Sequence, residues 1–143
     1  MSHPARAGLV WLLQGLFALR VLGQIYVGLY QPSWLPGWDE WYSGLMPYPW
    51  LLPTQLVMLT AMTALSYDYA RGSGRLLIES ARLGRVVRGF SYLYAGAMLL
   101  RYGLTMWLAP EMRWLHGTIP IVFHLVLAAY LYLLTVAPTP RHA

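Results

Sequence analysis

Residues 8–30 read GLVWLLQGLFALRVLGQIYVGLY, an apolar run in which the charged residue is Arg20. A helix rises about 1.5 Å per residue and the hydrocarbon core of a bilayer is about 30 Å thick, so roughly 20 such residues cross a membrane. Arg20 interrupts the run and no small-x-small cleavage site follows it. We therefore interpret the segment as a retained membrane-spanning helix and not as a signal peptide.

Three further segments have the same character, at approximately residues 50–70, 90–109 and 117–137. The chain is 58% apolar and 10% charged, against about 25% charged residues in soluble domains, and its mean hydropathy is +0.47. These values argue against a soluble, disordered or nucleic-acid-binding protein. The absence of cysteine excludes a disulfide or cysteine–zinc scaffold. Residues 1–143 are expected to form one all-α integral membrane domain, a bundle of four transmembrane helices.

The arginines predict how these helices are oriented. The loop between the second and third spans contains Arg71, Arg75, Arg82, Arg85 and Arg88. The loop between the first and second spans instead carries two acids, Asp39 and Glu40, and no basic residue. Because basic residues are retained on the cytoplasmic side during insertion, the second loop and both termini should be cytoplasmic. We expect a bacterial inner (plasma) membrane location.

The outer loop, residues 31–50, is rich in tryptophan, tyrosine and proline. Pro36 can begin a short helix there, with acidic residues in its first turn, where the helix dipole favours negative charge. One interpretation is an interfacial helix within the aromatic belt of the outer membrane surface. The alternative is a lid over a membrane-embedded site, formed by Trp38, Asp39, Glu40 and Trp41.

The inner loop, residues 71–88, places its five arginines among leucine, isoleucine and valine residues. This composition predicts a basic amphipathic helix lying along the cytoplasmic leaflet. Anionic lipid head groups of that leaflet attract such a helix by roughly 1 kcal/mol per basic residue. The lipid bilayer itself is therefore an expected partner of this segment.

Polar side chains recur near the middle of the predicted spans. An ionisable group at the bilayer centre costs at least about 2.5–3.5 kcal/mol on insertion scales, so each one needs a partner or a purpose. Each span contributes at least one such polar residue at similar depth: Arg20, Gln24, Gln55, Arg101 and His124. No aspartate or glutamate lies at that depth. This convergence predicts a shared intramembrane pocket with two arginines that are not neutralised locally.

Three explanations of the pocket remain open. In the first, the guanidinium groups bind the head of an amphipathic anionic or quinone-like lipid. In the second, the chain is an accessory or assembly subunit, and Arg20 and Arg101 pair with acids of a partner membrane protein or of another copy of the chain. In the third, the arginines bond only to backbone carbonyls, glutamine amides and water.

The sequence also leaves enzymatic activity open. His124 could act as acid or base while the two arginines stabilise an anionic intermediate, as a lipid-modifying enzyme would require, but no motif selects that chemistry. No cofactor or metal is evident, because His116 and His124 lie about 12 Å apart along one helix and cannot form a bis-histidine haem site. Two small-residue pairs, Thr60 with Ala64 and Ser91 with Ala95, predict close packing of the second and third spans.

Overall fold

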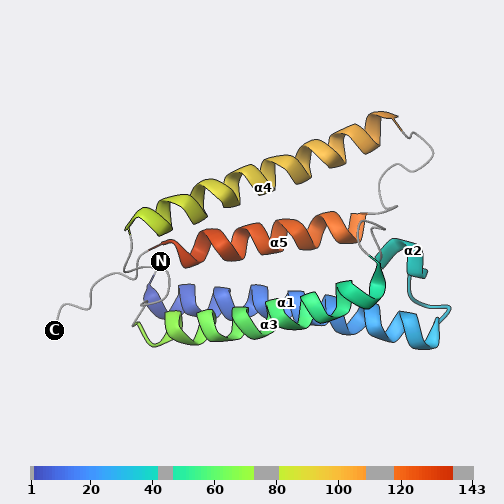
Figure 1. The fold of residues 1–143 in the computed structure, drawn as a ribbon, viewed down its shortest axis with the longest axis horizontal. Coiled ribbons are helices and arrows are strands. Elements are labelled where there is room, and N and C mark those ends of the chain that lie inside the picture. Colours follow the sequence, from blue (N-terminus) through green and yellow to red (C-terminus); the bar gives the residue numbers. More distant parts are fainter. Residues whose placement is uncertain (1, 42–46, 73–80, 109–117, 137–143) are drawn as a thin grey trace.

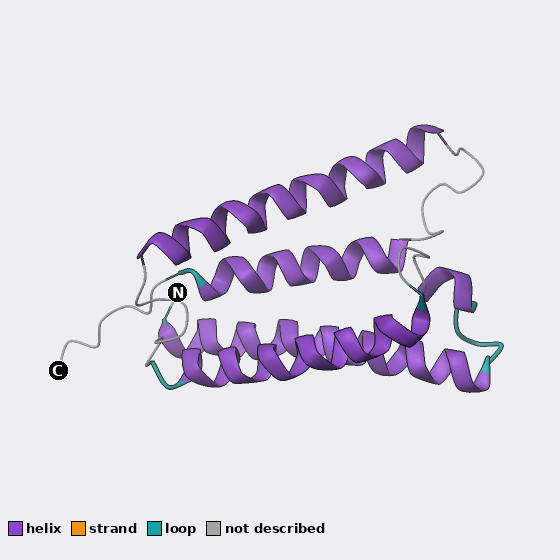
Figure 2. Cartoon of the chain, in the orientation of Figure 1, coloured by secondary structure: helices purple, strands orange, loops and turns teal. Residues whose placement is uncertain are grey.

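The computed structural model describes residues 2–41, 47–72, 81–108 and 118–136, and all the regular structure within them is helical (Figure 2). Four long helices are α1 (His3–Tyr30), α3 (Tyr48–Ala70), α4 (Ala81–Leu108) and α5 (Thr118–Leu134), and α2 (Trp38–Trp41) is a single short turn. Each of the four predicted spans coincides with one long helix. The short helix predicted in the outer loop is α2.

Proline accounts for the start of two helices, and a left-handed residue caps the end of one. Pro4 lies in the first turn of α1 and Pro49 in the first turn of α3, where a missing backbone N–H costs no helical hydrogen bond. α1 ends at Gln31, which adopts a left-handed conformation (φ 43°) and donates its backbone N–H to the carbonyl of Val27. This arrangement is a common helix C-cap.

Helices α1 and α4 begin earlier than the apolar spans that predicted them. Hydropathy marks the apolar part of a helix, whereas helical hydrogen bonding continues through polar residues that favour helix, such as arginine. α4 runs without a break from Ala81, so Arg82, Arg85 and Arg88 belong to its first turns. The prediction of a separate basic helix over residues 71–88 is therefore wrong for these three residues. Arg75 lies outside the described residues.

The long helices alternate in direction, and α1 begins at the same end of the molecule at which α5 ends (Figure 1). α5 packs between α1 and α4, and α1 also packs against α3. Among the described residues, α4 contacts α5 and neither α1 nor α3. The prediction that the second and third spans pack closely is therefore wrong: Thr60 and Ala64 are exposed on α3, while Ser91 is buried on α4.

The core lies between α1, α3 and α5. The buried positions of α1 recur every three or four residues, apart from one adjacent pair: Ala7, Val10, Gln14, Phe17, Arg20, Val21, Gln24 and Val27. This spacing is the narrow stripe of a helix that packs at a small angle against its neighbours. Two glutamines and an arginine lie on that stripe, so the packed face of α1 is polar at three points.

One described helix, α1, is long and apolar enough to cross a membrane, judged by length and composition. α5 is apolar but shorter, at 17 residues. α3 and α4 have lower hydropathy because α3 includes polar residues such as Gln55 and Asp68, and α4 begins with its arginines.

Candidate functional site

Three of the five predicted pocket residues form a hydrogen-bonded group, here called the polar cluster: Arg20, Gln24 and Gln55. Arg20 Nη1 donates to Gln24 Oε1 at 2.8 Å, as expected for residues one helical turn apart. Gln55 Nε2 on α3 donates to the same oxygen at 3.2 Å. The exposed fractions are 8% for Arg20, 0% for Gln24 and 4% for Gln55, so the cluster is enclosed between α1 and α3.

Arginine fixes the orientation of both amides in the polar cluster. A guanidinium group has only donors, so the Gln24 amide must turn its oxygen toward Arg20. That oxygen in turn requires the nitrogen of Gln55. Three buried polar atoms are then left without a partner: Arg20 Nε, Gln24 Nε2 and Gln55 Oε1. Buried polar atoms in folded proteins are nearly always paired with protein, water or ligand, which makes these three atoms the notable feature of the cluster.

The short helix α2 covers the outer side of the polar cluster. Arg20 Nη2 donates to the backbone carbonyl of Trp41 at 3.0 Å, and the Trp41 indole N–H donates to the carbonyl of Pro36 at 3.1 Å. The Trp41 ring lies so close to Gly23 of α1 that a Cβ there would be 2.7 Å from a ring carbon. Trp38 lies in the same way over Gly28.

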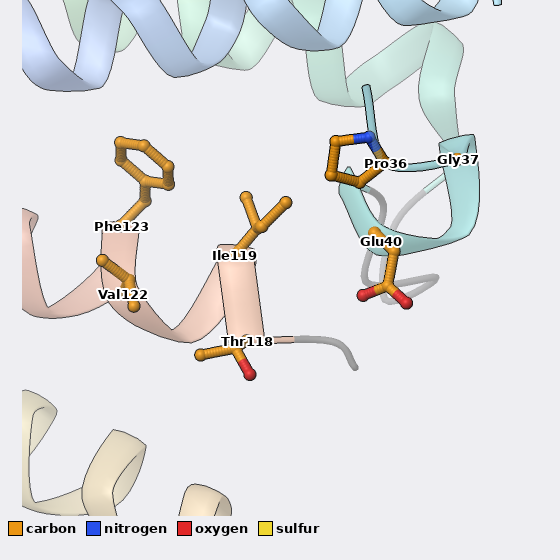
Figure 3. A pocket seen from close by; sticks show the side chains of 7 residues that line it. All are labelled: Pro36, Gly37, Glu40, Thr118, Ile119, Val122 and Phe123. Atoms are coloured by element: carbon orange, nitrogen blue, oxygen red, sulfur yellow. The ribbon is translucent and has the colours of Figure 1, made fainter. Parts of the chain in front are cut away.

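Two of the four predicted lid residues, Trp38 and Trp41, are thus seated on glycines of α1. The segment from Pro36 to Trp41, here called the lid, is joined to the cluster through the Trp41 carbonyl. The side chain of Asp39 lies outside the described part of the structure. Glu40 lines an outer cavity of ≈ 710 Å³ between the lid and the first turns of α5 (Figure 3). The remaining lining residues are Pro36, Gly37, Thr118, Ile119, Val122 and Phe123.

His124 lies on α5 and bonds to α4 instead of joining the polar cluster. Its Nδ1 is 2.5 Å from the hydroxyl oxygen of Tyr94, and the two rings meet edge to face. This contact joins α5 to α4.

Arg101 is half-buried on α4 and borders a separate cavity of ≈ 430 Å³. The other lining residues are Ala97, Leu100, Leu104, Thr105 and Leu108, all on α4. The five predicted residues thus occupy three separate positions: the polar cluster, the Tyr94–His124 pair and the groove on α4. The Arg20 guanidinium is enclosed, whereas Arg101 lies beside an apolar groove.

Sequence reasoning missed two buried polar groups in the same helices. Gln14 Nε2 donates to Thr63 Oγ1 at 2.7 Å and its Oε1 has no partner. Tyr130 donates to the carbonyl of Met62 at 2.8 Å and lies 3.0 Å from Ser66 Oγ. The signal that identifies Gln14 is its place on the same stripe of α1 as Gln24.

Three of the five arginines predicted to contact the membrane surface make local contacts with the protein. Arg88 donates to the carbonyl and hydroxyl of Thr135 at 2.7 and 3.2 Å, which ties the start of α4 to the end of α5. The Arg71 guanidinium lies 4.1 Å from the centre of the Tyr67 ring. Arg85 donates to the carbonyl of Ala81. Arg82 is exposed.

No protein-family profile, curated protein or solved structure matches the chain.

Proposed function

We propose that the chain is a small multi-pass membrane protein of the bacterial inner membrane that binds an amphipathic anionic or quinone-like lipid. The head group binds at the polar cluster, beneath the lid, and the tail lies along apolar helix surfaces. The observation that carries the proposal is the enclosed Arg20 guanidinium, whose hydrogen-bond acceptors are neutral and whose Nε has no partner. A positive charge with an unmet donor, enclosed among helices, favours a ligand that supplies oxygen acceptors.

The distribution of side chains supports a membrane location. Leucines of α1 and α4 face outward, with exposed fractions of 64% for Leu19, 62% for Leu22 and 73% for Leu93. Gln24 and Ser66 are meanwhile among the fully buried side chains. In water, extended apolar faces of this kind would drive association, whereas in a bilayer they face lipid. We infer that all four long helices cross the membrane with both termini cytoplasmic.

Single cysteines test this topology directly, because the chain contains no cysteine. In intact cells a membrane-impermeant maleimide should label Ser33→Cys, in the loop between α1 and α2. Ser2→Cys, before α1, should be labelled only after the cells are permeabilised. Equal labelling of both in intact cells would contradict the orientation, and release of the protein by alkaline carbonate would contradict membrane integration.

Native mass spectrometry of protein extracted gently from its own membrane tests the ligand. The expected result is a discrete small mass on the wild-type chain that is lost in Arg20→Met, which keeps the length of the side chain and removes its charge. Arg85→Met is the matched control, since Arg85 is an exposed arginine at the start of α4, and it should retain the mass. An unliganded wild-type chain, or equal occupancy in Arg20→Met, would refute the proposal.

The second candidate is an accessory subunit of a larger membrane complex, and the packing of α4 favours it. Among the helices described, α4 packs against α5 alone, and Arg101 stands half-buried on it beside an apolar groove. An acidic residue of a partner helix would fit there. In the same experiment this role predicts a stoichiometric protein partner that is lost in Arg101→Met and kept in Arg20→Met.

A further inference from the structure

The unpaired atoms of the polar cluster describe the head group that would satisfy them. Two are donors, Arg20 Nε and Gln24 Nε2, and one is an acceptor, Gln55 Oε1. Each belongs to a side chain that is bonded to the next at 2.8 or 3.2 Å, so the three atoms belong to one hydrogen-bonded group. A head group that satisfies all three atoms must offer acceptor oxygens and one hydrogen-bond donor.

Rotation of the amides does not remove this requirement. If Gln55 were turned, its oxygen would face the oxygen of Gln24 and their hydrogen bond would be lost. If Gln24 were turned, its nitrogen would face the guanidinium of Arg20, which has no acceptor. Arg20 therefore imposes the pattern of two donors and one acceptor on any occupant of the site.

We propose that the head group is an anionic oxygen acid that keeps one O–H, a hydrogen phosphate monoester. A carboxylic acid ionises beside the Arg20 guanidinium and then has acceptors only. This inference rests on the proposed lipid-binding function and narrows its ligand class. The acid accepts hydrogen bonds from Arg20 Nε and Gln24 Nε2 and donates its proton to Gln55 Oε1. A quinone ring or an ester has acceptors only, so it leaves Gln55 Oε1 unmet and buried.

The lid is consistent with a deep, selective site. The Trp41 carbonyl is a neutral acceptor for Arg20 Nη2, so Nε is the guanidinium nitrogen that has no acceptor. The outer cavity borders the lid segment, where Pro36, Gly37 and Glu40 line it.

The test measures lipid affinity for the full chain in phosphatidylcholine nanodiscs by native mass spectrometry. Three probes share an oleoyl tail, 1-oleoyl lysophosphatidic acid, oleic acid and methyl oleate, and decylubiquinone adds a quinone with a shorter tail. The lysophosphatidic acid should bind at least tenfold more tightly than oleic acid and methyl oleate, because one unmet buried hydrogen-bonding group costs about that factor.

Substitutions of buried glutamines identify the residue that is responsible for the head-group preference. Gln55→Leu should weaken lysophosphatidic acid binding about tenfold and abolish its preference over oleic acid. Gln14→Leu is the matched control, since Gln14 is also buried with an unpaired Oε1 but bonds to Thr63 instead of the cluster. It should change neither the affinity nor the preference. Equal binding of lysophosphatidic acid and oleic acid, or an unchanged preference in Gln55→Leu, would overturn the inference and leave lipid binding standing. Failure of all four probes to bind would refute lipid binding itself.

Discussion

Replacing Gly23 by alanine should open the lid while leaving the helix bundle folded. A Cβ at this position would lie 2.7 and 2.8 Å from two ring carbons of Trp41. Carbon atoms in favourable contact are about 3.5–4.0 Å apart, so the ring has to withdraw by roughly 1 Å. It cannot do so freely, because its indole N–H is bonded to Pro36 and its backbone carbonyl to Arg20.

Gly23→Ala has two opposing effects, one on the closing of the lid and the other on the folding of α1. Overpacking by one methyl group costs about 1–3 kcal/mol, and here that cost weighs on the closed lid. The change from glycine to alanine inside a helix stabilises the helix by about 0.8–1.0 kcal/mol, and that gain belongs to the folding of α1. Lid opening should therefore become roughly 5- to 150-fold more favourable, whereas the melting temperature should change little.

Hydrogen–deuterium exchange of the lid, read at the Glu40 amide that bonds to the carbonyl of Gly37, measures the opening. Gly15→Ala is the control, because a Cβ at Gly15 has nothing within 4 Å. It should stabilise α1 slightly and leave lid exchange unchanged. If Gly23→Ala exchanges as slowly in the lid as Gly15→Ala does, then the Trp41 ring does not hold the lid and the reasoning fails.

Two further substitutions test contacts that tie the helices together. Tyr130→Phe should destabilise the bundle by about 1–3 kcal/mol in a detergent unfolding titration, because its buried hydroxyl makes two hydrogen bonds to α3. The control, exposed Tyr67→Phe, should change the stability by under about 0.5 kcal/mol. Equal effects of the two substitutions would contradict a stabilising role for the Tyr130 hydroxyl. Arg88→Met should cost about 1–2 kcal/mol and speed amide exchange near Thr135, since it loses two bonds to that residue. Arg85→Met should change neither the stability nor the amide exchange near Thr135. If both variants behave alike, Arg88 does not hold α4 to α5.

The sequence predicted the four long helices because each contains a long, mainly apolar segment, although α1 alone among the described helices is long and apolar enough to cross a membrane. It placed their ends less well, since Pro4 and the arginines of α4 are compatible with helix but are not apolar. It also predicted that the second and third spans pack together. Small-residue pairs identify a surface that permits close approach, but in this chain Ser91 is buried on a helix that packs against α5.

Counting residues along the spans gives the depth of a side chain, and depth was enough to group Arg20 with Gln24 and Gln55. It was not enough for His124 and Arg101, which lie at a similar depth but belong to the α4–α5 side of the molecule. The difference is the rotation of each helix about its axis, which is set by packing against its neighbours. Within α1 the stripe of buried residues carries that information and includes Gln14 as well as Arg20.

The energetics of Arg20 separate a binding role from a purely structural one. In the proposed membrane topology, placing an arginine at the bilayer centre costs about 2.5–3.5 kcal/mol on insertion scales, and an unmet buried Nε adds about 1–3 kcal/mol. The two charge-assisted bonds to Gln24 and to the Trp41 carbonyl return about 1.5–3 kcal/mol each. These contributions nearly cancel, so Arg20→Met should leave the stability of the unliganded bundle within about 1–2 kcal/mol of wild type. A stable Arg20→Met chain without its ligand would then mean that the guanidinium serves the ligand and not the fold.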